Sequence, residues 1–428
     1  MYTQTQEKTM ITGKSKIKKS FKKIFECRVC YSKELVFILS LGNQYLSDFV
    51  KGNPKIKKYP LELVICKKCS LVQLAHTTPP AYLYTERYGY RSGINDTMKK
   101  ELAEIVKKAL KKKFLKKDDI VVDIGSNDGT LLSNYKKGVT VGFEPVKKFA
   151  KASEKFCSYS INDYFSYSAF QKLPKSIREK KVKIVTAISM FYDIDAPNNF
   201  LKDITKVLDK NGILIIQQNY LPGMLLQNAF DNILHEHLEY YSLASIEYLL
   251  AMHNMYVFDV EETPINGGSF RTYIRFKDNN KNKVSSRVKK MKEKEKKLML
   301  SSLKTYRDFA SRVDKIISQL HDFIYQKAKE GNKIYLYGAS TRGNTLIQSC
   351  KFNNKVIFAA VERNPEKWGK KIASVRIPII TEEKARQDKP DYMLVLPWFF
   401  KKEFLKREKE YLKKGGHFIF PLPKITVV

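Results

Sequence analysis

The chain contains no run of about 18 or more consecutive apolar residues, the length that a helix needs to cross a bilayer. We therefore expect no transmembrane helix and no membrane partner. The N-terminus also lacks the pattern of a secretory signal peptide, so we expect a cytoplasmic protein with reduced thiols. A chain of 428 residues is nevertheless long enough for two or three domains with substantial cores.

Acidic residues are scarce, because 44 Asp and Glu stand against 79 Lys and Arg, for a net charge of +35. Such an excess is found in proteins that bind nucleic acid. The lysines are, however, spread along the whole chain, and segments such as 289–297 are typical of solvated helix faces. We therefore expect no nucleic-acid partner. Attraction for an anionic small substrate accounts for the charge equally well.

Cysteine is also rare, yet four of the six cysteines form two C-x-x-C pairs, Cys27 with Cys30 and Cys66 with Cys69. Two such knuckles supply the four thiolates of a tetrahedral zinc site. Ordinary buried cysteines and disulfides are the alternatives, and the missing leader and the patternless spacing of the other two thiols argue against disulfides. Four thiolates close the coordination shell, so we expect the zinc to hold the fold and do no chemistry. The gap between the pairs is longer than in a minimal zinc ribbon, so we expect a segment to fold within it.

Apolar strands alternate with helices from residue 119 to about 278, and again from 333 onward, which favours two α/β units with parallel sheets. Candidate strands are 120–124, 140–143, 184–187 and 212–217 in the first unit and 334–337, 356–361, 392–396 and 418–421 in the second. Helices are expected near 95–115 and over about 283–330, where an apolar stripe from Met299 to Leu320 indicates a packing and spacer helix. We therefore divide the chain into a basic flexible lead-in (1–23), a zinc-binding domain (24–80), a central α/β domain (81–282), a linking helix (283–330) and a smaller C-terminal Rossmann-like domain (331–428).

A loop with two glycines follows the first strand of the central unit, where residues 123–130 read Asp-Ile-Gly-Ser-Asn-Asp-Gly-Thr. Glycine allows tight turns and close approach of a ligand. Glu144 follows about twenty residues later, where an acid can bind both ribose hydroxyls. This arrangement resembles the S-adenosylmethionine (SAM) loop of class I methyltransferases. The alternative is a Rossmann domain for another cofactor, and Asp123 and Glu144 favour SAM or NAD over a phosphorylated ribose. The residues expected to bind the cofactor are Asp123, Gly125, Asn127, Gly129, Glu144 and Asp163, the last in a segment that is either an adenine contact or an ordinary loop.

Histidine is as scarce as cysteine, and two of the six histidines, His235 and His237, flank Glu236. Histidine can remove a proton near neutral pH, and an adjacent acid can orient it. Metal chelation by the His-x-His pair is the alternative, but no further Cys or His lies nearby in the sequence. We therefore favour acid–base chemistry for the segment 230–243.

Five motifs occur in one order along the chain: the zinc knuckles, the loop at 123–130, the His-Glu-His segment, Asn-Gly-Gly-Ser-Phe-Arg at 266–271 and Tyr-Gly-Ala-Ser-Thr-Arg-Gly-Asn-Thr-Leu at 337–346. The series resembles the nucleotide-sugar C-methyltransferases of deoxysugar and surface-polysaccharide pathways, over about residues 24–425. The resemblance implies an α/β fold with an N-terminal zinc domain, a class I methyltransferase Rossmann-like sheet and a C-terminal Rossmann-like domain that helps to hold a nucleotide-sugar substrate. It says nothing of the oligomeric state.

The resemblance also implies a mechanism, in which a base removes the acidic proton beside the carbonyl of a keto-sugar and the resulting enolate carbon attacks the SAM methyl group. The family's base falls on His237, with Glu236 orienting or polarising it. Either Tyr88 or Tyr90 falls where a tyrosine donates to the enolate oxygen. We expect the substrate to be bound by Asn228, His235, Asn266, Arg271, Arg342 and Asn344, with Arg342 facing the diphosphate.

Two departures from the family pattern bear on the substrate. Tyr192 stands where characterised members carry a histidine, and Leu234 stands where they carry a tyrosine. Tyr192 and Asp193 can supply replacement polar groups, and we count Tyr192 among the catalytic candidates. Which sugar, which nucleotide and which carbon are involved stays open. The rival functions are SAM-dependent methylation of oxygen or nitrogen, including on nucleic acid, and a non-catalytic zinc-stabilised protein that binds a sugar nucleotide, which an empty or blocked SAM pocket would favour.

Overall fold

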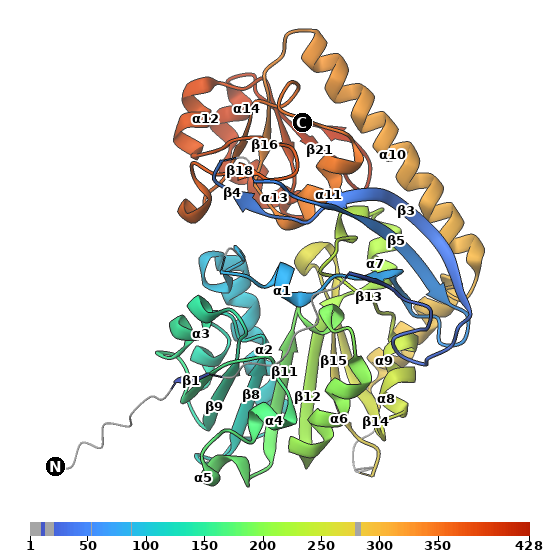
Figure 1. The fold of residues 1–428 in the computed structure, drawn as a ribbon, viewed down its shortest axis with the longest axis vertical. Coiled ribbons are helices and arrows are strands. Elements are labelled where there is room, and N and C mark those ends of the chain that lie inside the picture. The colour runs from blue at the N-terminus through green and yellow to red at the C-terminus, as the bar shows by residue number, and fades with distance from the viewer. Residues whose placement is uncertain (1–9, 13–20, 53, 87, 279–283) are drawn as a thin grey trace, which may run out of the picture.

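The computed structural model describes residues 10–12, 21–52, 54–86, 88–278 and 284–428. Most of the predicted lead-in (1–23) lies outside these residues. Figure 1 shows a large α/β unit below, a smaller α/β unit above, and the long strands β3 and β5 between them. The helices are α1 Pro80–Leu83, α2 Asp96–Lys112, α3 Lys147–Ser153, α4 Tyr167–Phe170, α5 Lys175–Arg178, α6 Pro197–Val207, α7 Leu221–Leu226, α8 Leu243–Ala251, α9 Ser286–Lys297, α10 Leu303–Lys329, α11 Thr341–Ser349, α12 Glu382–Asp388, α13 Lys401–Arg407 and α14 Lys409–Lys413.

The central sheet has the order β1-β10-β9-β8-β11-β12-β15-β14. The first six strands in this order, β1, β10, β9, β8, β11 and β12, run parallel to one another. β15 is antiparallel to β12, and β14 is antiparallel to β15. All five residues of β8 are buried, as expected for a strand covered on both faces. Strand order reverses between β8 and β11, and ligands of such sheets bind at the carboxyl ends beside this switch point. The strands are β1 Met10–Thr12, β8 Ile120–Ile124, β9 Val139–Phe143, β10 Tyr159–Asn162, β11 Val182–Ile188, β12 Leu208–Asn219, β14 Met255–Thr263 and β15 Ser269–Phe276.

The zinc-binding segment forms an antiparallel sheet of order β13-β6-β5-β3, from β3 Leu35–Tyr45, β5 Lys58–Cys66, β6 Val72–Leu74 and β13 Glu239–Tyr240. Its outermost strand, β13, comes from the central unit and directly follows His237. In register, Glu239 lies opposite Gln73 and Tyr240 opposite Val72. A second short ladder joins β2 Lys22–Lys23 to β7 His76–Thr77.

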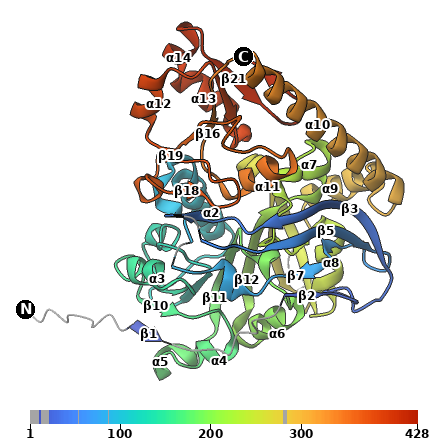
Figure 2. The same cartoon turned by 45° about the horizontal axis from the view of Figure 1, so that its top comes forward.

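The long gap between the two cysteine pairs forms an arm that reaches the C-terminal unit (Figures 1 and 2). Strand β4 Phe49–Val50 pairs with β18 Lys371–Ile372. The Tyr45 amide donates to the Gln348 side chain at 2.8 Å, and that side chain donates back to the Tyr45 carbonyl at 3.1 Å. A segment does fold within the gap, as expected. It consists of β3, β5 and, between them, the stretch that carries β4, which we call the arm.

The C-terminal unit is a second α/β sheet of order β19-β17-β16-β20-β21-β22, parallel except for β22. Its strands are β16 Ile334–Tyr337, β17 Ala359–Val361, β19 Ile379–Ile380, β20 Tyr392–Val395, β21 His417–Phe420 and β22 Thr426–Val427. Its core is continuous with that of β3, β5 and α10, so the arm and the long helix pack against one apolar cluster with this unit.

The predicted linking helix is two helices, α9 and α10, separated at 298–302. Met299 has a left-handed backbone (φ 49°), the conformation that ends helices, and its side chain is 60% exposed rather than part of the stripe. Leu303 is partly buried, and the stripe from Tyr306 to Leu320 is buried and continues to Ile324. Helix α10 lies along β3 in both views (Figures 1 and 2). Among the described residues, no helix has the length and apolar character to cross a membrane.

Candidate functional site

The four cysteines of the knuckles converge on one point. Their sulfur atoms all lie within 4.8 Å of one another. In each knuckle the residue after the second cysteine, Tyr31 or Ser70, has a positive φ, and its amide donates to the carbonyl of the first cysteine. The Cys69 thiol, hydrogen-bonded to Cys27, lowers the pKa of Cys27 to about 5. Four sulfur donors at this spacing fit a closed tetrahedral zinc site.

Arg28, inside the first knuckle, ties the metal site to the central unit. Its guanidinium donates to the Leu74 carbonyl at 2.7 Å and to Asp195 at 3.1 Å, and it lies 3.8 Å from Glu239. The Asn198 side chain donates to the Val29 carbonyl at 2.8 Å. The zinc site is therefore fixed both to the segment after β11 and to the strand after His237.

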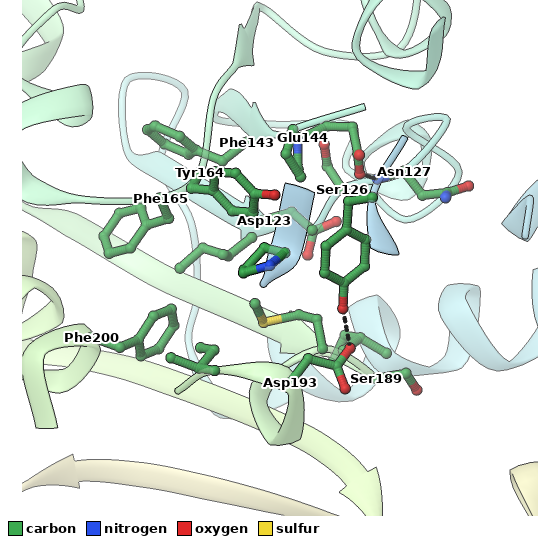
Figure 3. A pocket seen from close by; sticks show the side chains of 18 of the residues that line it. Asp123, Ser126, Asn127, Phe143, Glu144, Tyr164, Phe165, Ser189, Asp193 and Phe200 are labelled. Carbon is green, nitrogen blue, oxygen red and sulfur yellow. Dashed lines mark hydrogen bonds between the residues drawn. The ribbon is translucent and has the colours of Figure 1, made fainter. Parts of the chain in front are cut away.

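A cavity of about 420 Å³ opens at the carboxyl ends of β8, β9 and β11 (Figure 3). Five of the six predicted cofactor residues line it: Asp123, Gly125, Asn127, Glu144 and Asp163. Gly129 is not in the wall; its φ is 81°, and a Cβ there would meet Ser153 at 3.0 Å, so it shapes the loop from behind. The aromatic residues Phe143, Tyr164, Phe165 and Phe200 line one end, and the 162–165 motif pointed to only two of them.

Glu144 accepts hydrogen bonds at both carboxylate oxygens, from the Asn127 amide at 2.9 Å and the Val146 amide at 2.8 Å. Burial raises its pKa to about 7, although these two bonds oppose the shift. Burial likewise raises the pKa of Asp123 to about 7, opposed by its bond from the Thr186 hydroxyl at 2.5 Å. Each oxygen of Glu144 retains a second lone pair, so the carboxylate can accept two ribose hydroxyls.

The segment 88–94 lies against the cofactor loop and brings Tyr88 and Tyr90 to the cavity wall. Asn127 accepts from the Ser92 amide at 2.9 Å and donates to the Tyr90 carbonyl at 3.2 Å. Asp128 accepts from the Gly93 amide at 3.0 Å. The loop that would hold the cofactor therefore also positions two of the candidate tyrosines.

The His-Glu-His segment adjoins this cavity without lining it. His237 lies edge-on to Tyr192, with ring centroids 4.4 Å apart, and its Nδ1 is 2.9 Å from the Asn232 carbonyl. Burial and the Arg342 charge lower the pKa of His237 to about 3. Burial raises the pKa of Glu236 to about 8, with a further contribution from Asp48.

His235 points the other way from His237. It is buried, and its Nε2 lies 3.2 Å from the carbonyl of Tyr59 on β5. Burial lowers its pKa to about 4. Its ring therefore holds the segment against the zinc-binding sheet, and the two histidines do not form a chelating pair with any third His, Cys, Asp or Glu of the described chain.

Most of the predicted substrate-binding residues are engaged by the protein itself. Arg271, 2% exposed, bonds Gln217, Glu101 and Glu261 and joins β15 to α2. Asn344 is fully buried and accepts from Ser374. Asn228 bridges the Pro423 carbonyl and Arg312. None of the three lies in the wall of the cavity.

Arg342 joins the C-terminal unit to the central unit beside the acid–base segment. Its guanidinium pairs with the buried Asp231 at 2.9 Å, contacts the Asn266 carbonyl and lies over the Phe399 ring at 5.0 Å. Trp398 also donates to Asp231, at 3.0 Å. Arg342 is thus committed to an ion pair, and its charge reaches His237. This pairing was not visible from the motif alone.

Comparison with known proteins finds matches to three successive regions of the chain. Three family models match the chain: "Putative zinc binding domain" at 27–84, "Methyltransferase domain" at 94–259 and "C-methyltransferase C-terminal domain" at 264–423. The C-methyltransferase NovU of Streptomyces niveus is 28% identical over 411 residues, which cover 95% of this chain and 97% of NovU.

Among solved structures, a SAM-dependent methyltransferase from Clostridium acetobutylicum is 13% identical, with 43% of this chain and 93% of that chain covered and a TM-score of 0.34. The plantazolicin methyltransferase BamL, solved with SAH, is 12% identical, with 42% and 86% covered and a TM-score of 0.34. The three family models follow one another along the chain without overlap, and the match to the relative spans nearly all of both chains. The chain is therefore a SAM-dependent methyltransferase that matches a zinc-binding, a methyltransferase and a C-methyltransferase C-terminal domain model in this order.

Proposed function

We propose that this protein methylates a carbon next to the carbonyl of a nucleotide-activated keto-sugar, through an enolate. The observation that carries the proposal is the position of His237, which lies against Tyr192 next to the predicted cofactor cavity and is adjacent to Glu236 in the chain. Burial lowers the pKa of His237 and raises that of Glu236, which favours a neutral imidazole and a protonated carboxyl group near pH 7. Carbon methylation needs a base for the C–H proton, whereas a hydroxyl or amine acceptor needs one less strictly. We place the reaction in the cytoplasm, where both SAM and nucleotide sugars are made.

The hydrogen bond of His237 fixes which ring nitrogen is the base. A carbonyl oxygen can only accept, so the contact with the Asn232 carbonyl requires a proton on Nδ1. Nε2 then carries the free lone pair, and no hydrogen bond to it occurs in the described residues. With a pKa of about 3 the ring is neutral at physiological pH. His237 can therefore accept the substrate proton at Nε2.

Glu236 and Tyr88 are suited to donate hydrogen bonds to the enolate oxygen. With a pKa of about 8, Glu236 is mainly protonated at pH 7. Burial and the nearby Glu236 raise the pKa of Tyr88, so its phenol also keeps its proton. Tyr88 lines the cofactor cavity and interacts electrostatically with Glu236. These donors would stabilise the oxygen where negative charge develops.

Bound SAM supplies an electrophilic methyl group on a sulfonium sulfur. Glu144 would accept the ribose hydroxyls, and the aromatic end of the cavity would hold the adenine. The loop at 125–129 would enclose the methionine part. A cavity of about 420 Å³ at this position disfavours the rival non-catalytic scaffold, for which a blocked pocket was expected. The pairing of Arg342 with Asp231 indicates that it sets the position of the C-terminal unit beside His237 rather than meeting a diphosphate directly.

The proposal predicts a carbon-bound methyl group in the product. We expect purified protein, incubated with SAM labelled with ¹³C in the methyl group and a panel of nucleoside-diphosphate keto-sugars, to add about 15 mass units, the mass of a ¹³CH₂ group, to at least one sugar. Carbon-13 NMR would show the new methyl group coupled to a ring carbon. Label on oxygen or nitrogen would contradict carbon transfer, and no turnover of any keto-sugar would contradict the substrate class.

Replacing Glu144 with alanine is expected to weaken SAM binding by about 1.5–3 kcal/mol, or roughly 10- to 100-fold, because hydrogen bonds to a charged carboxylate are lost. A carboxyl group with a pKa of about 7 is protonated at lower pH, so wild-type affinity should fall as pH drops below 7. This dependence should weaken in the variant, in which Asp123, with a pKa also of about 7, is the remaining acid of the cavity that titrates in this range. Calorimetry from pH 6 to 8 measures both effects. Glu179→Ala, at an exposed acid of the same unit, is the control. Unchanged affinity in Glu144→Ala would remove Glu144 from the site.

A further inference from the structure

Tyr84 and Asp193 form a polar pair in the wall of the cofactor cavity. Tyr84 follows α1, and Asp193 ends the 3-10 helix Phe191–Asp193 after β11. The Tyr84 hydroxyl donates to Asp193 Oδ2 at 2.7 Å (Figure 3). The other oxygen, Oδ1, is buried and has no hydrogen-bond partner within the described part of the chain.

The position of the pair relates it to the acceptor side of the cavity. Asp193 directly follows Tyr192, whose ring contacts that of His237. Burial raises the pKa of Asp193 well above its usual range, and the charge of Glu236 adds to the shift although the bond from Tyr84 opposes it. Asp193 therefore lies close enough to feel Glu236 while it faces the cavity.

Asp193 differs from Glu144 and Asp163, two other acids of the cavity, because one of its oxygens is buried without a hydrogen-bond partner in the described part of the chain. Both oxygens of Glu144 accept backbone amides. Both oxygens of Asp163 are engaged, by the Tyr164 amide at 2.9 Å and by Lys172 at 3.0 Å. A buried acceptor left without a donor is costly, so one that persists in a cavity wall indicates a donor supplied by a ligand.

We propose that Asp193, positioned by Tyr84, accepts a hydrogen bond at Oδ1 from a ring hydroxyl of the keto-sugar, next to the carbon that is methylated, and so selects sugars that carry this hydroxyl. The inference rests on the proposed function. Tyr84 is a positioning residue in this scheme, because it touches the carboxylate and not the substrate. A site built to bond a substrate hydroxyl discriminates strongly against the analogue that lacks it, since its own polar group is then left unpaired.

The test compares wild type and one variant, each on the intact substrate and on substrates that lack one hydroxyl. Asp193→Asn keeps the shape of the side chain and can still accept from Tyr84 through its oxygen, but it turns an amide donor toward the cavity. We expect kcat/KM for a nucleoside-diphosphate 4-keto-6-deoxyhexose to fall about 10- to 100-fold, the scale of leaving a buried polar group without its hydrogen-bond partner. Among analogues that each lack one ring hydroxyl, one should be a poor substrate of the wild type. The variant should methylate this analogue at the same low rate as the wild type, because the hydrogen bond is already missing. Tyr84→Phe should show the same substrate dependence with a smaller loss.

Two measurements distinguish this from a fold defect or from a role in cofactor binding. SAM affinity by calorimetry and the unfolding temperature should stay near wild type in Asp193→Asn, with the exposed Asp118→Asn as the control. The inference is overturned if Asp193→Asn loses SAM affinity to the same extent as kcat/KM, or if all analogues lose turnover equally. It is also overturned if the intact substrate is methylated at the wild-type rate. If the wild-type enzyme methylates the keto-sugar, the proposed function stands whichever of these outcomes is found for the variant.

Discussion

A His237→Ala protein is expected to methylate its substrate about 10²–10⁴-fold more slowly than wild type while binding SAM normally, because the loss of a general base typically costs this much. The Asn232 carbonyl holds Nδ1, so Nε2 is the ring nitrogen left to take the proton. The ring contacts Tyr192 but does not line the cofactor cavity, so SAM affinity should not depend on it. Single-turnover kinetics and calorimetry separate the two quantities.

His235→Ala is the matched control, since His235 flanks the same glutamate. Its ring bonds the Tyr59 carbonyl, so its loss should lower stability more than the rate of the chemical step. Exchange of the acidic substrate proton with deuterated water, without SAM, reports the base directly if deprotonation is reversible. We expect exchange in wild type and His235→Ala and little in His237→Ala. Wild-type methylation by His237→Ala would refute the assignment.

Elements with strong local patterns were predicted from the sequence. The strand at 120–124 and the strand at 334–337 coincide with β8 and β16, because a central parallel strand reads as a continuous apolar run. The cofactor loop was equally visible, since glycines and one acid at fixed spacing are a local signal. The convergence of the four cysteines follows from spacing alone.

What the sequence could not predict depends on contacts between distant segments. β13 joins the zinc-binding sheet although 165 residues separate Glu239 from Leu74, whose amide bonds the Leu238 carbonyl. The motif Asn-Gly-Gly-Ser-Phe-Arg suggested that Arg271 binds substrate, but a buried arginine beside Glu101 and Glu261 is neutralised within the protein. Tyr84 was missed for the same reason: its partner Asp193 is 109 residues away. Polar pairs between distant residues produce no periodic pattern in the sequence.

Removal of zinc is expected to unfold the zinc-binding sheet and to abolish methyl transfer while SAM binding survives. We expect elemental analysis to find one zinc per chain, held by Cys27, Cys30, Cys66 and Cys69. Binding of a structural zinc contributes folding free energy of about 10 kcal/mol or more, so Cys66→Ser or chelation should lower the unfolding temperature of this unit strongly. Cys157→Ser, at a buried thiol outside the cluster, is the control.

The loss of activity follows from the sheet itself. β13 begins two residues after His237 and pairs with β6, which directly follows the second knuckle. Arg28 of the first knuckle lies against Asp195 and Glu239. Without the metal these contacts lose their fixed partner, so the base and the end of β11 should both become disordered. The cofactor loop at 125–129 depends on β8 and β9 instead. SAM binding should therefore survive, weakened by the disorder of the β11 end that also lines the cavity, and should fall far less than activity. Full activity in the chelated protein, or no stoichiometric zinc in the native one, would show that the cysteines do not hold a metal on which the catalytic segment depends.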